Sequence, residues 1–434
     1  MTVQDAFMLL ESHNNLCNIV AVLGLSGSDM HIEALRVLVS ETLLAPQPAS
    51  GGESFADAAL EVRWSKLKQR PVKRCGIWHW EDVADRFRIE DHVLEVQCAA
   101  DEASTAEMLA RLQSEPMSQD RPLWDLRLAR TAEKSVVFVR FHHAIGDGLA
   151  LVNMFLEATG NSMAAQPPKV GHRGLRGILG WILVVLQAPL EAVLQVMQRG
   201  DRSGIKPLAL RGKKKAAVSP HIPLSRLKAV ARREGCSVTA VAGLCFGHAL
   251  QVGRSAEQAG STVSPMHKVW MPVSLARAQN KHAMLENNIC FVPLCLQAGA
   301  GVPDLCCIEQ QLRCLKEGDL AWKLYLILQG TMALLPLPLA NSLLTFCGNK
   351  AMGIMSSVPG PRTALVWGKW EVDSIIFLVP QRSNVAVGLS MVSCADHVRL
   401  GVSVDEAVEL DPEKMIAGWT EALEKLEEHT TGRS

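Results

Sequence analysis

Two different spacings of apolar residues run along the chain, and they predict its strands and helices. Residues 135–141 (SVVFVRF) alternate and are rich in β-branched and aromatic side chains, which predicts a strand. In residues 149–159 (LALVNMFLEAT) the apolar positions recur at helical spacing, which predicts a helix soon after that strand.

The second half of the chain mixes the same two patterns. Helices are predicted at 222–235, at 237–253 and, with Pro412 near its start, at 412–429. Strands are predicted at 267–275, 287–297, 383–393 and 397–406. Because both halves mix strands and helices and no repeat of about 20 to 50 residues is present, we expect an α/β or α+β protein with large mixed sheets flanked by helices.

Two stretches carry no charge and are more apolar than ordinary surface. The first is 178–190 (ILGWILVVLQAPL), which contains Pro189, and the second is 324–349, which contains Pro336 and Pro338. A helix rises about 1.5 Å per residue and a bilayer has a hydrocarbon core of about 30 Å, so these lengths and helix breakers fit a transmembrane span poorly. We therefore expect a buried or interfacial helix pair.

The length of the chain suits two domains. A chain of 434 residues is too long for one small core and fits two units of roughly 200 residues each. We predict an N-terminal domain at 1–165, a basic and apolar crossover linker at 166–218, and a C-terminal domain at 219–434. From 199 to 215 the linker has seven basic residues and one acid, which is typical either of a solvated linker or of a segment that sits on anionic lipid.

Charge and cysteine content exclude several classes of function. The 44 Lys and Arg residues equal the 44 Asp and Glu residues, whereas a general nucleic-acid binder carries a marked basic excess. The 12 cysteines form no C-x-x-C pair and no finger-like Cys/His spacing, so no metal site is predicted. Asp5 and Glu11 stand where a signal peptide needs a basic start and an apolar stretch, so we expect an intracellular protein with free and mostly buried thiols.

The most informative segment is 142–148 (HHAIGDG), between the predicted strand and helix. A neutral imidazole can remove a proton from a hydroxyl group, and the end of a strand holds it in a fixed position. Asp147 lies four residues past His143, on a turn that Gly146 and Gly148 can form. It can therefore orient an imidazole, or fix the turn by binding an arginine, for which Arg127 and Arg140 are possibilities.

A noncatalytic role for this segment, and a different nucleophile, are both less well supported by the sequence. The noncatalytic alternative is a polar turn with two solvated histidines. The chain has no G-x-S-x-G and no G-x-x-x-x-G-K-[ST] motif, and no local signature pairs one of its cysteines with a histidine.

The segment 141–155 (FHHAIGDGLALVNMF) resembles the active-site motif of CoA-dependent acyltransferases with the chloramphenicol-acetyltransferase fold. Within that superfamily the chain is most similar to the bifunctional wax ester synthase/diacylglycerol acyltransferases. Further segments resemble this narrower family in the same order: Asp5-Ala6-Phe7 with Leu10-Glu11, Pro122-Leu123-Trp124-Asp125, Met271-Pro272-Val273-Ser274-Leu275 with Asn288, and Ser356-Ser357-Val358-Pro359-Gly360-Pro361.

The resemblance implies two similar domains that meet at a tunnel with His143 at its centre. His143 would act as the general base, with His142, Asp147 and Gly148 of the same motif. The reaction would move a long-chain acyl group from acyl-CoA to a fatty alcohol or diacylglycerol without an acyl-enzyme, giving wax ester or triacylglycerol. Asn288 and Ser356 are candidates to stabilise the oxyanion or bind substrate.

The same resemblance sets expectations for partners and location. No cofactor is expected, because acyl-CoA is a substrate. The expected partners are acyl-CoA, the long-chain alcohol or diacylglycerol, and a membrane or lipid-droplet surface, with no nucleic acid. The protein is expected in the cytoplasm or on the cytoplasmic face of the endoplasmic reticulum or plasma membrane.

Three departures keep alternatives open. Thr239 and Ala240 stand where the family has an Asn-Asp pair, Ser357 stands where it usually has Asn, and Ala276 precedes Arg277 where it often has Arg directly. The alternatives are an acyltransferase with this motif but another acceptor, such as a plant-type alcohol acyltransferase or a condensation domain, and a catalytically silent lipid-binding homologue. A glycerolipid acyltransferase with an H-x-x-x-x-D motif would use His142 and Asp147, but its glycine-rich phosphate motif is missing.

Overall fold

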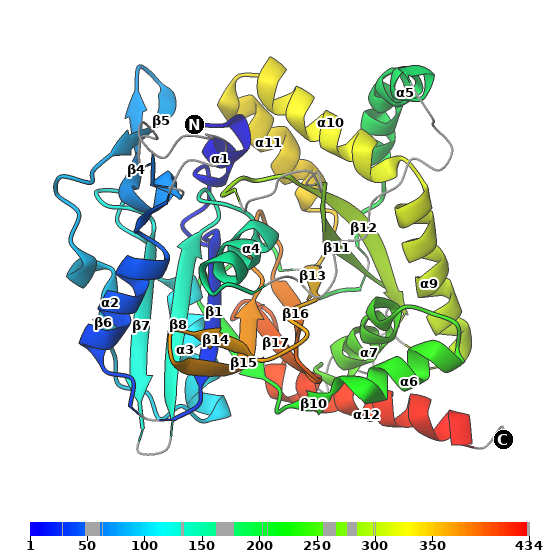
Figure 1. Cartoon of the computed structure of the whole chain (residues 1–434). Helices are drawn as coiled ribbons and strands as arrows, with labels where there is room; N and C mark the ends of the chain where they lie inside the picture. Colours follow the sequence, from blue (N-terminus) through cyan, green and yellow to red (C-terminus); the bar gives the residue numbers. More distant parts are fainter. Residues whose placement is uncertain are drawn as a thin grey trace.

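Two mixed β-sheets lie beside each other and carry helices on their outer faces (Figure 1). The computed structural model of the chain describes all residues except 28, 48–60, 63, 132–133, 162–177, 202, 206, 255–265, 276–283, 298, 300 and 432–434. The first part of the predicted linker, 166–177, therefore lies outside the described residues.

The first sheet has six strands in the order β14-β15-β1-β8-β7-β6. Its strands are β14 (Leu365–Trp367), β15 (Trp370–Leu378), β1 (Asn18–Leu25), β8 (Ser135–His142), β7 (Trp124–Arg130) and β6 (Val93–Glu95). All pairs are antiparallel except β6 with β7. Strand β8 is therefore an interior strand, and all eight of its residues are buried.

The second sheet has seven strands, with β10-β17-β16-β13-β11-β12 in order and β9 paired to β17. Its strands are β9 (Lys214–Val218), β10 (Ile222–Pro223), β11 (Met266–Ser274), β12 (Ile289–Gln297), β13 (Gly353–Val358), β16 (Val387–Cys394) and β17 (His397–Asp405). Strand β13 pairs in parallel with β11 and with β16. Two short hairpins, β2 (Pro46–Gln47) with β3 (Glu61–Val62) and β4 (Gln69–Arg74) with β5 (Ile77–Asp82), lie outside both sheets.

The described helices pack around these sheets, and α1, α11, α10 and α5 lie along the top of the molecule in Figure 1. They are α1 (Val3–Met8), α2 (Ile32–Thr42), α3 (Glu102–Ser114), α4 (Gly148–Ala158), α5 (Ile178–Met197), α6 (Leu224–Arg233), α7 (Val238–Val252), α9 (Val302–Glu317), α10 (Leu320–Leu334), α11 (Leu337–Gly348) and α12 (Pro412–Thr431). Periodicity alone located β8, α4, α6, α7 and α12 to within a few residues, so these predictions are confirmed.

The first sheet contains strands from both halves of the sequence. The hairpin β14–β15 comes from the second half but completes the first sheet, where β15 pairs with β1. Strand β9, inside the predicted linker, belongs to the second sheet. The division at 165 and 218 stays a prediction, and the first sheet needs a hairpin from the second half to be complete.

The two uncharged stretches form α5 and the pair α10–α11. No single helix of the described chain is long and apolar enough to cross a membrane; only α6 and α7 pass such a test together, and they meet at a 103° bend. A buried position is wrong for α5, because most of its described side chains are exposed. The other alternative, that α5 lies at a membrane interface, stays a prediction.

The prediction that most thiols are buried is wrong. Four of the 12 cysteines are buried, four are half-buried and four are exposed. Three of the exposed ones, Cys306, Cys307 and Cys314, lie on the solvent side of α9. Cysteines were expected in the core because they behave as small hydrophobic residues. In α9, however, the buried positions are occupied by Leu305, Ile308, Leu312 and Leu315.

Candidate active site

The histidine pair stands at the end of β8, held by both neighbouring strands. Asn18 of β1 lies opposite His142, and Trp124 of β7 lies opposite Phe141. The backbone N–H of His143 donates to the carbonyl of Cys17 at 2.8 Å. Because the strand is interior and fully paired, the backbone of both histidines is fixed.

The turn after the pair leads directly into α4. Asp147 is the N-cap of this helix, with φ −77° and ψ 168°, and its Oδ1 accepts a hydrogen bond from the backbone N–H of Ala150 at 2.9 Å. Neither Gly146 nor Gly148 has a positive φ, so the turn does not require the conformational freedom of glycine. A Cβ on Gly148 would meet no atom within 4 Å, which leaves open space at the start of α4.

The contacts of His143 determine which ring nitrogen carries the proton. Nδ1 lies 2.9 Å from Oδ1 of Asn287. The amide of Asn287 is oriented by its other end, because Nδ2 donates to Oδ1 of Asp5 and to the carbonyl of His143, both at 2.9 Å. A carboxylate and a carbonyl only accept, so Oδ1 of Asn287 must face the imidazole and Nδ1 must donate to it. The neutral ring therefore has its free lone pair on Nε2.

His142 has the opposite tautomer. Its Nδ1 accepts a hydrogen bond from the backbone N–H of Ala144 at 3.1 Å, so that nitrogen carries no proton. Its Nε2 lies 3.2 Å from Oε2 of Glu11 and donates to it. The same carboxylate accepts from the backbone N–H of Cys17. Both ring nitrogens of His142 are engaged within the protein, which leaves His143 as the imidazole with a free acceptor.

A buried ion pair stands behind Asn287. Asp5 on α1 is fully buried, and its Oδ2 lies 2.8 Å from Nζ of Lys66. The same ammonium donates to the carbonyl of Ile145 at 3.1 Å, within the turn after the histidine pair. Asp5 thus holds Asn287, and Lys66 ties Asp5 to the turn after the histidine pair, so the site is anchored from α1 as well as from β8.

Burial sets the ionisation of this cluster. Burial lowers the pKa of His143 below its usual 6.5, and the nearby negative charge of Asp147 opposes that shift. Burial also raises the pKa of Asp147, against hydrogen bonds from the backbone N–H groups of Asn288 and Ala150. Burial raises the pKa of the Cys17 thiol to about 12, so Cys17 is not a thiolate nucleophile. His143 is therefore a neutral imidazole near pH 7.

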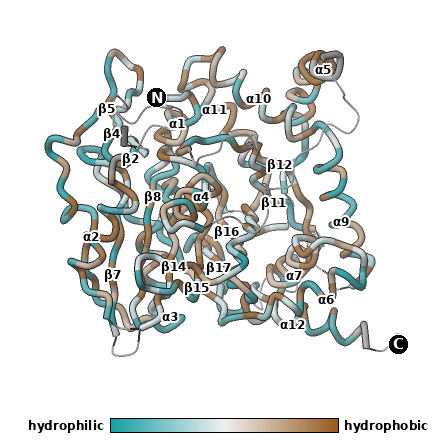
Figure 2. Tube along the Cα trace, in the orientation of Figure 1, coloured by the Kyte–Doolittle hydropathy of each residue, from teal (hydrophilic) through white to brown (hydrophobic). Residues whose placement is uncertain are grey.

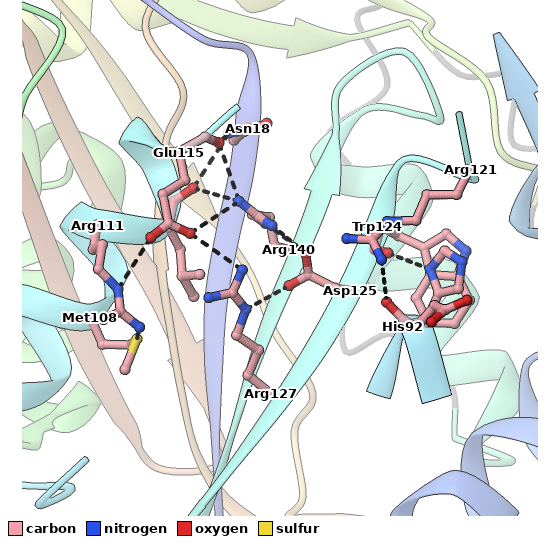
Figure 3. Close-up of polar contacts among 12 residues, drawn as sticks. Asn18, His92, Met108, Arg111, Glu115, Arg121, Trp124, Asp125, Arg127 and Arg140 are labelled. Carbon is pink, nitrogen blue, oxygen red and sulfur yellow. Dashed lines mark hydrogen bonds and ion pairs between the residues drawn. The ribbon is translucent and has the colours of Figure 1, made fainter. Parts of the chain in front are cut away.

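The prediction that Arg127 or Arg140 binds Asp147 is wrong. Arg140 donates to Asp125 from Nε at 2.9 Å, and Arg127 binds Asp125 at 3.1 Å and Glu115 at 3.3 Å. Figure 3 shows both arginines directed at this acidic pair. Asp125 stands opposite Arg140 across β7 and β8, so the arginines fix the strand that carries the histidines.

Asp147 is held instead by the second half of the chain. Its Oδ2 accepts a hydrogen bond from the backbone N–H of Asn288 at 3.0 Å, and its own N–H donates to the carbonyl of Glu286 at 3.2 Å. Residues 286–288 precede β12 and therefore join the turn 143–147 to the second sheet. Asp147 fixes the turn, as expected, but it does so by binding the backbone of Glu286 and Asn288 and not an arginine side chain.

The two candidate oxyanion donors lie apart from the described contacts of His143. The side chain of Asn288 donates to Glu286 at 3.0 Å and accepts from Tyr325 at 3.5 Å. Ser356 is buried in β13, in register with Ser390 of β16. Asn287 was not among the site residues predicted from the sequence, although the Asn287-Asn288 doublet before a strand was an available signal. Among the described residues, no group of three or more His, Cys, Asp or Glu side chains could hold a metal ion.

The departures at Thr239 and Ala240 lie on α7, in the core of the second domain. Ala240 is fully buried among the apolar residues that surround α7 and α12, and Ser237 caps the helix. Neither residue has a described contact with His143, Asn287 or Asp147. The absence of this Asn-Asp pair therefore leaves the described hydrogen bonds of the histidine cluster intact.

Two family models match the chain over most of its length: the wax ester synthase/diacylglycerol acyltransferase catalytic domain over residues 1–199 and the WS/DGAT C-terminal domain over residues 288–427. A Mycobacterium tuberculosis protein named as a diacylglycerol O-acyltransferase is 21% identical, covering 93% of this chain and 95% of its own. Wax ester synthase/diacylglycerol acyltransferase 7 of Arabidopsis thaliana is 34% identical over 86 residues, so the match spans only 18% of that relative and 18% of this chain. The solved wax ester synthase/diacylglycerol acyltransferase of Marinobacter aquaeolei VT8 has the same fold, with a TM-score of 0.64, 16% identity and 98% coverage of both chains.

Proposed function

The chain belongs to the wax ester synthase/diacylglycerol acyltransferase family, and from that premise we propose that it transfers a long-chain acyl group from acyl-CoA to a fatty alcohol or to diacylglycerol, with His143 as general base. The observation that supports this role most directly is the tautomer of His143. Asn287 holds the proton on Nδ1, so Nε2 is free to accept one.

The proposed reaction needs one proton carrier. Nε2 of His143 takes the hydroxyl proton of the acceptor while its oxygen attacks the thioester carbonyl. The tetrahedral oxyanion then collapses, the carbon–sulfur bond breaks, and the imidazolium returns the proton to the CoA thiolate. Since the thioester is already activated, this scheme calls for no cofactor beyond the acyl-CoA substrate. Ser356 and Asn288 are the proposed groups for the oxyanion or the bound substrate, each such donor being worth about 3 kcal/mol where it acts.

The supporting residues fit this chemistry. His142 and Asp147 position the base, since His142 is bound at both nitrogens and Asp147 joins the turn to residues 286–288. The acceptor class is supported by the apolar helices α10 and α11: Leu328, Met332 and Leu344 pack against the cluster that contains Phe141, Ile145 and Leu151. A tunnel at this junction, with His143 at its centre, is part of the proposal.

A competition assay tests the proposal. Purified protein receives acyl-CoA with a fatty alcohol and diacylglycerol together, and products are separated by chromatography while free CoA thiol is measured. His143→Ala is expected to lower kcat by about 10² to 10⁴-fold. His79→Ala, an exposed histidine on β5, is the matched control and should keep the wild-type rate.

Two outcomes would reject this function. Wild-type protein that binds long-chain acyl-CoA but releases no thiol with either acceptor would be a silent lipid-binding homologue. An unchanged rate in His143→Ala would remove the base from the mechanism.

A further inference from the structure

Helix α5 exposes its apolar side chains to solvent. Nine large apolar residues of α5 are between 41% and 73% exposed: Ile182, Leu183, Val185, Leu186, Leu190, Val193, Leu194, Val196 and Met197. At about 100° per residue they spread over about half of the helix circumference. Figure 1 places the helix at the edge of the molecule, and Figure 2 colours much of it as hydrophobic. A surface helix of a globular protein shows the reverse pattern.

The exposure belongs to a helix that is fixed in place. Val184 and Gln195 are buried on the opposite side of α5, where it packs against α10. At its C-terminal end the buried ammonium of Lys350 donates to the carbonyls of Gln195 at 2.9 Å and Gln198 at 2.8 Å, and to that of Val196. A cation on the last carbonyls stabilises a helix end. The apolar side of α5 therefore faces outward in a defined orientation.

The neighbouring helices α10 and α11 also expose large apolar side chains. Leu334 at the end of α10 is 84% exposed, and Leu339 and Phe346 of α11 are 55% and 54% exposed. The sequence from 324 to 349 has no charged residue, and α5 has one, Glu191. A contiguous exposed apolar area larger than about 600 Å² is unusual on a monomer and marks an interaction site. We call α5, α10 and α11 together the apolar face.

Charge distinguishes the possible occupants of this face. Residues 166–200, which contain α5, have four Lys and Arg residues and one acid, a net charge of +3 in a chain whose net charge is zero. Lys169, Arg173 and Arg176 precede α5 in the sequence, and the exposed Arg199 follows it. A symmetric contact between two copies would bring these like charges together. An anionic lipid surface would attract them, at about 1 kcal/mol per basic residue near the surface.

The length and polarity of α5 fit a helix that lies in the plane of the lipid. Pro189 interrupts the 20-residue helix, and no single described helix could span a membrane. One side of α5 is packed on protein, so only the exposed half is available to acyl chains. We propose that the apolar face docks the protein on an anionic phospholipid surface, with α5 inserted at the level of the headgroups and the exposed Arg199, just past its C-terminal end, at the headgroup charges.

This docking deepens the proposed function, because it names the surface from which long-chain substrates would reach the site. Helix α10 packs against both α5 and α1, and α1 carries Asp5 of the histidine cluster. The apolar face therefore lies one helix away from the catalytic turn. The test below needs no reaction, so its outcome does not depend on the proposed activity.

Vesicle flotation of the full chain tests the proposal. Phosphatidylcholine vesicles with and without phosphatidylserine are mixed with wild-type protein and with Leu186→Glu/Leu190→Glu, whose two positions lie in the middle of the exposed arc. The matched control is Val37→Glu/Ile77→Glu, which changes two residues of similar exposure, 55% and 64%, on α2 and β5. We expect wild type and control to float with the phosphatidylserine vesicles, and the α5 variant to bind at least tenfold more weakly.

Thermal unfolding of each variant without lipid shows that it is folded, and binding should weaken as salt is raised. Equal flotation of the α5 variant and the control would overturn the proposal, as would binding only to neutral vesicles. A lipid-free dimer that Leu186→Glu/Leu190→Glu dissociates would assign the face to a second copy instead. Flotation without any CoA release would reject the proposed activity and leave this docking intact, whereas CoA release without flotation would do the opposite.

Discussion

Asn287→Leu removes the hydrogen-bond acceptor of His143 Nδ1 and keeps a side chain of similar size. In the native site Oδ1 of Asn287 accepts from Nδ1 at 2.9 Å, and both residues are buried. A buried donor left without a partner costs about 1 to 3 kcal/mol. The imidazole can escape this cost by moving its proton to Nε2, which blocks the lone pair that the base needs. Either route lowers kcat, by about 5- to 150-fold at about 1.36 kcal/mol per tenfold.

The assay is CoA thiol release at saturating acyl-CoA and alcohol, so that kcat and KM are separated. Asn161→Leu is the matched control, because the side chain of Asn161 binds Thr159 at the C-terminal end of α4 and has no described contact with His143. We expect a lower kcat with little change in KM for Asn287→Leu, and a near-native kcat for Asn161→Leu. A kcat within twofold of wild type for Asn287→Leu would refute the tautomer argument. An equal loss in both variants would refute it as well.

Three further predictions concern the charges around the site and in the second sheet. Glu11→Ala removes the acceptor of His142 Nε2 and should lower the free energy of unfolding in urea by about 1 to 3 kcal/mol, whereas Glu11→Gln keeps an acceptor and most of the stability. Asp147→Asn removes the negative charge that raises the pKa of His143, so the acidic limb of kcat/KM should move to lower pH; a move to higher pH would contradict the assignment. Burial lowers the pKa of His267 from 6.5 to about 4, so unfolded His267 binds a proton in this window while native His267 does not. The free energy of unfolding should fall by about 3 kcal/mol from pH 6.5 to 4, and His267→Phe should flatten that slope in urea titrations.

Local signals in the sequence predicted the element that presents the histidines. Alternation located β8, helical spacing located α4, and the histidine motif between them lies at their junction in the structure. These features depend on residues within about ten positions of one another, where side-chain period and capping determine the backbone. For the same reason Asp147 could be recognised as a residue that fixes the turn, since the N-cap position is local.

The partners of these residues could not be predicted, because they are distant in sequence. Asn287 lies 144 positions from His143. The ion pair between Arg140 and Asp125 follows from the register in which β7 pairs with β8. The pairing of β15 with β1 crosses most of the chain. The apolar sequence of α5 indicated a buried or interfacial helix, but periodicity describes the side chains and not the surface that covers them, so it could not show that α5 faces outward.

The site is complete only when the two halves of the chain are docked. Asp5 from the N-terminus, the turn 143–147 and residues 286–288 each supply part of one hydrogen-bond network. Asp147 receives the backbone of Asn288, and that contact places Asn287 beside the imidazole. If the halves separate, Asp147 loses a buried donor and His143 loses the acceptor that keeps its proton on Nδ1. The tautomer of His143, the proposed base, is therefore set by the same contacts that join the two sheets, and a change that loosens the junction should lower kcat even where it touches none of the three groups.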